Sequence, residues 1–124
     1  MADKDPKAAL QEDVDTTHGV LLDIDAKYDD YWKEIHTRPE PEATALWNQY
    51  LAARAKAWSN YDLARAKLFD SIVRDGQRLA KLKSDLEQQK QRVDDALANL
   101  QNISQSLQDL SLAVEIGAVL WGGL

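Results

Sequence analysis

The sequence has 124 residues and a mass of 14.0 kDa, enough for one small domain and too little for two independent cores. It contains no cysteine, which excludes disulfides, thiolate metal sites and cysteine nucleophiles. Alanine and leucine occur 17 times each, whereas valine, isoleucine and threonine together occur 15 times. This balance predicts an all-α protein.

The net charge of −6 is concentrated in the N-terminal third of the chain. Residues 1–42 carry 12 acidic and 5 basic side chains, and the other ten basic residues all lie between positions 54 and 92. These regions can neutralise each other within or between chains, or lie on solvated helix faces. Nucleic acid is not an expected partner, because the acidic region would repel its phosphates.

The first predicted elements are a partly ordered acidic arm at residues 1–19 and a helix at about residues 20–36. Asp, Thr and Gly residues make the arm a weak helix former. The helix is predicted from apolar residues at spacings of three and four, which place five side chains on one face: Leu21, Ile24, Tyr28, Tyr31 and Ile35. Pro39 and Pro41 end this segment, since neither can donate a backbone hydrogen bond.

Two long tracts follow without internal proline, and they predict helices at about residues 41–74 and 77–116. Gly76 lies between them and favours an αα-turn, with the glycine in the left-handed position after the helix end. A single helix from 41 to 116 is the alternative, because Ile72 and Leu79 are seven residues apart and keep the heptad phase.

The third predicted helix carries coiled-coil heptads over five repeats. With Leu79 at position a, the seam consists of Leu79, Leu82, Leu86, Gln89, Val93, Ala96, Leu100, Ile103, Leu107, Leu110 and Val114. The polar Gln89 either lies buried in the seam and fixes its register or reaches solvent at a helix crossing. The predicted fold is a long helical hairpin or three-helix bundle, and the seam predicts self-association.

Two further groups of residues are candidate interaction surfaces. Seven of the nine aromatic residues lie between positions 28 and 61, where they form either the core between the first helices or an exposed anchor that includes Trp32, Trp47 and Trp58. Residues 117–124 form an apolar C-terminal tail with Trp121. The tail is expected to pack in an oligomer, to contact a membrane, or to begin a longer hydrophobic segment.

The sequence contains no common motif of catalysis or of cofactor binding. There is no G-x-S-x-G turn, no glycine-rich phosphate loop and no metal-binding spacing around His18 or His36, so we expect no enzyme, no metal and no cofactor.

The predicted function is a non-enzymatic assembly or adaptor module that binds a protein partner or a second copy. The alternative is the N-terminal helical region of a membrane-active toxin or translocated effector whose hydrophobic segment starts near the C-terminus. Because no apolar segment follows Met1, we expect a cytoplasmic protein without a cleaved signal peptide, with membrane association or non-classical secretion as alternatives.

Overall fold

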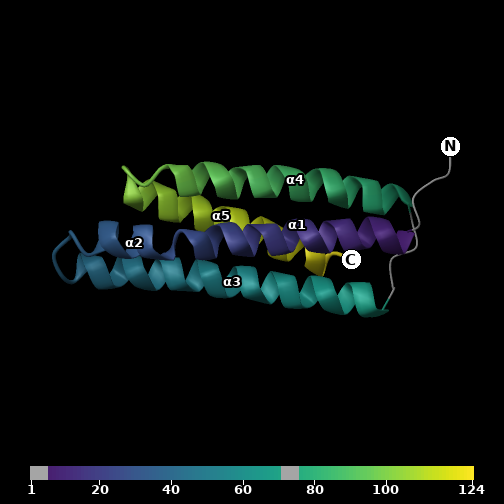
Figure 1. The fold of residues 1–124 in the computed structure, drawn as a ribbon, viewed down its shortest axis with the longest axis horizontal. Helices are drawn as coiled ribbons and strands as arrows, with labels where there is room; N and C mark the ends of the chain where they lie inside the picture. The colour runs from purple at the N-terminus through teal and green to yellow at the C-terminus, as the bar shows by residue number, and fades with distance from the viewer. Residues whose placement is uncertain (1–5, 71–75) are drawn as a thin grey trace.

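The computed structural model describes residues 6–70 and 76–124, and these residues form five helices. In chain order the helices are α1 (Pro6–Ala26), α2 (Tyr28–Ile35), α3 (Glu42–Asp70), α4 (Gly76–Ala98) and α5 (Ile103–Gly122) (Figure 1). The prediction of an all-α fold with helices packed as a bundle is therefore confirmed.

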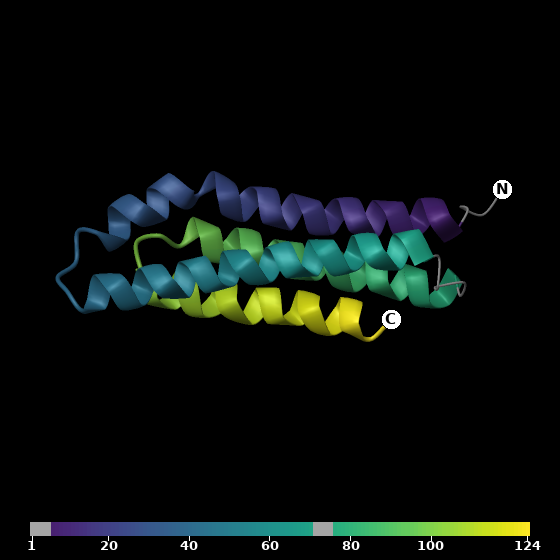
Figure 2. The ribbon, with the colours of Figure 1, turned by 90° about the horizontal axis from the view of Figure 1, so that it is seen from below.

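The four long helices lie side by side, with the short α2 at one end. Helix α1 contacts α3 and α4, and α5 contacts the same two helices, so that α3 and α4 occupy opposite corners of the bundle. Helices α1 and α4 run in one direction and α3 and α5 in the other (Figure 1). Figure 2 shows α2 lying over the first turns of α3. Each long helix thus has two neighbours that cover its apolar face.

The chain reverses direction between α3 and α4, which excludes a single helix from 41 to 116 (Figure 1). Gly76 is the first residue of α4, so it does not end the preceding helix as predicted. Residues 71–75, which connect the two helices and include Arg74 and Asp75 of the predicted turn, lie outside the described part of the chain.

Helix α1 corrects the prediction of a partly ordered arm at residues 1–19. From residue 6 onward the segment is helical, and residues 1–5 lie outside the described ranges. Leu10 and Val14 are buried in one cluster with side chains of α3, α4 and α5. The hydroxyls of both threonines in α1 donate to backbone carbonyl oxygens one turn earlier. Tertiary packing therefore outweighs the weak helix propensity of this segment.

The predicted helix at 20–36 is divided into α1 and α2 at Lys27. The carbonyl oxygen of Ile24 accepts from the Lys27 N–H at 3.2 Å and from the Tyr50 hydroxyl at 2.7 Å, which tightens the last turn of α1. The predicted apolar face continues across the break, and only Tyr28 of its five members is exposed. Both prolines lie in the link to α3, as predicted.

The predicted helix at 77–116 is wrong in its middle, where residues 99–102 form a turn between α4 and α5. The Asn99 N–H donates to the Ala96 carbonyl oxygen at 3.1 Å. The side chain of Asn102 accepts from the Gln105 N–H at 3.4 Å and caps α5. Asparagine favours such turns and caps over helix interiors, whereas the heptad pattern alone ignores this preference.

The heptad pattern nevertheless identified the core positions of α4 and α5. Ten seam residues are buried and Leu100 is half-buried. Because the turn at 99–102 lays α5 against α4, these side chains are covered within the chain by α1, α3 and each other. The seam is therefore part of the core and is not left on the surface for a second copy.

Leu107 lies in the middle of this core and Leu112 lies on the outside of the same helix, 60% exposed. We expect Leu107→Ala to lower the free energy of unfolding by about 2–5 kcal/mol, because it leaves a cavity. Leu112→Ala should change it by less than about 0.5 kcal/mol. Urea titration followed by circular dichroism measures both, and equal effects of the two substitutions would contradict the placement of α5.

Candidate functional site

A continuous group of aromatic rings, which we call the aromatic surface, lies where α2 packs on the start of α3. Its members are Tyr28, Trp32, His36, Trp47 and Tyr50. Trp47 is central: its ring is stacked on Tyr50 at a centroid distance of 5.2 Å and meets Tyr28 edge-on at 5.0 Å. The structure thus brings the predicted candidates Trp32 and Trp47 onto one surface.

The inner side of the aromatic surface is fixed by buried hydrogen bonds. Tyr31 stacks on Tyr50 and bonds to the Ser106 hydroxyl, which in turn donates to the Ala96 carbonyl oxygen at 2.6 Å. Burial raises the pKa of both tyrosines, so their hydroxyls stay protonated at neutral pH. Helix α2 is thereby attached to α4 and α5 as well as to α3.

The outer side of the aromatic surface is open to solvent at Trp32, whose side chain is 47% exposed. Its ring is stacked on His36 at 4.2 Å, and the His36 Nδ1–H donates to the Trp32 carbonyl oxygen at 2.7 Å. The hydrogen bond orients the His36 ring, which covers one face of the indole and leaves about half of the Trp32 side chain exposed.

Charged residues of both signs lie near the exposed rings. Asp29 and Asp30 are exposed on α2, and the Nζ atom of Lys27 lies 3.8 Å from a carboxylate oxygen of Asp30. The guanidinium of Arg54 lies 5.7 Å from the ring centroid of Tyr28. The same guanidinium donates a hydrogen bond to the Asp25 carboxylate, and this ion pair raises the pKa of Arg54.

The other two predicted tryptophans lie elsewhere. Trp58 is exposed on the outer face of α3, away from α2. Trp121 is fully buried, so its prediction as a surface residue is wrong. Its indole Nε1–H donates to the Thr17 hydroxyl at 2.8 Å and joins α5 to α1.

The apolar tail predicted at residues 117–124 is largely the last part of α5. Gly117 and Trp121 are buried, and Val119 is the exposed large apolar residue of this segment. The signal was present in the sequence, because Gly117 and Trp121 continue the heptad spacing beyond Val114. Among the described helices, none is both long enough and apolar enough to span a membrane.

Trp121→Ala should lower the free energy of unfolding by about 3–5 kcal/mol, because it removes the largest fully buried side chain. Trp121→Phe keeps most of the apolar volume and loses only the N–H donor to Thr17, so a smaller loss, about 1–2 kcal/mol, is expected. Guanidinium unfolding curves give both values. A wild-type stability for Trp121→Ala would show that the C-terminal end of α5 is not packed in the core.

Polar side chains inside the bundle were missed by the sequence analysis, except for Gln89. Gln89 is buried and its Nε2 donates to the Ala113 carbonyl oxygen at 3.2 Å, which decides between the two interpretations of this residue. Asn60 of α3 donates to the Val114 carbonyl oxygen at 2.9 Å. Gly117 makes room for both amides, since a Cβ atom there would lie 2.9 Å from the Asn60 Nδ2 atom. Together these residues fix how α5 lies between α3 and α4.

Asp13 is the most unusual of the buried polar residues. Its side chain is 1% exposed, and neither carboxylate oxygen has a hydrogen-bond partner. Burial raises the pKa of Asp13 to about 7; the neighbouring Glu12 and Glu87 add to the rise and Lys83 opposes it. Because the pKa of an unfolded aspartate is near 3.8, folding favours the protonated carboxyl.

The stability of the protein should therefore fall as the pH rises from about 4 to about 7, because over this range the carboxyl is ionised in the unfolded chain while the native carboxyl stays protonated. Asp13→Asn removes this titration. The variant should match the wild type within about 1 kcal/mol at pH 4 and exceed its free energy of unfolding by up to about 4 kcal/mol at pH 8. Chemical denaturation at both pH values tests this, and a pH-independent difference would contradict it.

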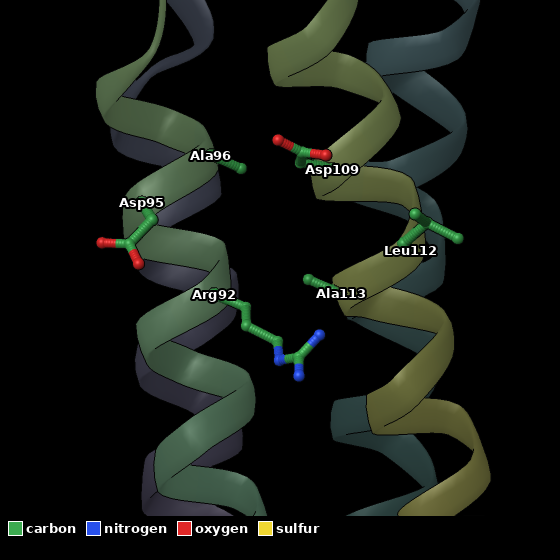
Figure 3. Close-up of a pocket in the computed structure, with 6 residues that line it drawn as sticks. All are labelled: Arg92, Asp95, Ala96, Asp109, Leu112 and Ala113. Carbon is green, nitrogen blue, oxygen red and sulfur yellow. The ribbon is translucent and has the colours of Figure 1, made fainter.

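A shallow pocket of about 210 Å³ lies between α4 and α5 (Figure 3). It is lined by Arg92, Asp95, Ala96, Asp109, Leu112 and Ala113. Arg92 extends into the gap between the helices, while Asp95 points away from it (Figure 3). The ionisable side chains of this lining are the carboxylates of Asp95 and Asp109 and the guanidinium of Arg92.

Neither a metal-binding group among the described residues nor a related protein indicates another functional site. Within residues 6–70 and 76–124, no group of three or more His, Asp or Glu side chains is placed to hold a metal ion. Both histidines are instead stacked on aromatic rings, His18 on Tyr61 and His36 on Trp32. Comparisons with family models, curated proteins and solved structures found no match to this chain.

Proposed function

We propose that the chain is a non-enzymatic helical assembly or adaptor module that binds a partner protein through the aromatic surface. The observation that carries this proposal is the half-exposed indole of Trp32, which is held in place by His36. Tryptophan and tyrosine are enriched among the residues that dominate binding energy at protein interfaces.

The rigidity of the aromatic surface supports the proposal. A binding side chain that is already ordered loses little conformational entropy when a partner covers it. Trp32 meets this condition because α2 is anchored through Tyr31 to Ser106 and through Tyr28 to Trp47 of α3. A partner would thus meet a preformed surface.

The surrounding charge favours a partner segment that is basic. Asp29 is exposed one turn before Trp32 on α2, and Glu40 and Glu42 are exposed in the link to α3 and at its start. Lysine or arginine on the partner can pair with these carboxylates, and arginine can also stack on the indole.

The alternative, a membrane-active toxin or translocated effector with a hydrophobic segment near the C-terminus, has less in its favour. Val114, Gly117 and Trp121, which would begin such a segment, are covered by other helices of the bundle. We therefore prefer the protein-binding function.

The experiment replaces Trp32 with a photo-crosslinking amino acid in cells that express the protein. Illumination should join the chain to one defined protein. Leu112 is the matched control position, because it is also exposed but lies on α5, away from the aromatic surface. The purified partner should then bind Trp32→Ala at least about tenfold more weakly than the wild type.

Titration calorimetry measures that loss, and circular dichroism checks that Trp32→Ala keeps its helices. Equal crosslinking from positions 32 and 112, or unchanged affinity for Trp32→Ala, would contradict the proposal.

A further inference from the structure

The outer face of α3 carries a second regularly spaced row of residues, which we call the outer stripe: Trp58, Asp62, Arg65 and Phe69. Their spacings of four, three and four place all four on one side of the helix. All are exposed, with Trp58 at 42% and Phe69 at 91%. Two large aromatic rings thus flank an acid and a base on a helix face that this chain leaves uncovered.

The charged groups of the outer stripe are free to pair with another chain, and the small residues beside the stripe allow a second helix to approach closely. Among the described residues, Asp62 has no ion-pair or hydrogen-bond partner. The guanidinium of Arg65 lies 5.4 Å from the ring centroid of Tyr61, which orients it without neutralising it. Ala55, Ser59 and Ala66 are exposed beside the stripe, and their small side chains let another helix approach closely.

The order of residues in the outer stripe is self-complementary when two copies meet in opposite directions. In an antiparallel pair, Trp58 can face Phe69 of the second copy while Asp62 faces its Arg65, because both pairs of residue numbers sum to 127. A parallel pair in register would instead place Asp62 against Asp62 and Arg65 against Arg65, which is unfavourable. Charge therefore selects the antiparallel arrangement.

We propose that a second copy of this chain covers the outer stripe, forming a two-fold symmetric dimer through antiparallel α3 helices. A shallow pocket of about 360 Å³ supports this contact, because it lies beside Phe69 and is lined by Lys7, Arg65, Leu68 and Phe69. In the dimer, Trp58 of the second copy lies against Phe69 at this pocket. Each copy contributes the same residues, as a two-fold interface requires.

The size of the outer stripe sets the expected affinity. From residue 58 to residue 69 the helix rises about 17 Å, so the contact is smaller than a standard interface. We therefore expect dissociation constants of roughly 1–100 µM. The outer stripe and the aromatic surface share no residue, so self-association is independent of the proposed partner binding.

The test reverses one charge in each of two variants, Asp62→Arg and Arg65→Asp. Each variant alone would place like charges in both facing pairs and should dimerise at least about tenfold more weakly than the wild type. An equimolar mixture of the two variants restores both pairs with opposite charge, as does the double variant. Sedimentation equilibrium at low salt should show dimers for the wild type, the mixture and the double variant.

The proposal is overturned if the wild-type protein stays monomeric near about 1 mM. It is also overturned if the single variants dimerise as strongly as the wild type, or if the mixture of the two variants does not form dimers. The Trp32→Ala variant should dimerise as the wild type does. The proposal is also overturned if Trp32→Ala abolishes the dimer while Asp62→Arg does not. Circular dichroism checks helicity. If either single variant unfolds, Phe69→Glu decides, because normal dimerisation of that variant overturns the proposal.

Discussion

The need to keep an apolar seam out of water governs this structure. Eleven heptad positions follow one another along α4 and α5, and a straight helix could cover them only with another chain. The turn at Asn99 and Asn102 folds the seam onto itself. Helix α5 then fills the space between α3 and α4, and its end reaches α1 through the bond from Trp121 to Thr17.

Periodicity in the sequence predicted which residues are buried far better than it predicted what buries them. The seam residues of α4 and α5 and four of the five residues on the face of Leu21 are in the core. An apolar stripe indicates that one face of a helix is buried, but it does not indicate which helix buries that face. The reversal at 99–102 was missed because two asparagines within a heptad pattern are a weak signal beside ten apolar positions.

The polar interior and the N-terminal helix could not be predicted for a different reason. Asp13, Asn60 and Ser106 are residue types that usually lie in solvent, and only tertiary contacts place them inside. Of the candidate surface, the sequence indicated the cluster of rings and named Trp32 and Trp47. It could not show that Trp58 lies apart from them, because this depends on how the helices are arranged around the bundle. The core position of Trp121, in contrast, agrees with the heptad spacing that continues past Val114.

The bond between Thr17 and Trp121 joins residues 104 positions apart, and this separation has a consequence for protein synthesis. Helix α1 leaves the ribosome first, yet its inner face at Leu10 and Val14 is completed by α5, the last of the five helices to be made. Contacts over such long sequence separations form slowly, and apolar surface stays uncovered until they do. During synthesis the apolar face of α1 therefore stays exposed to solvent until α5 has been made.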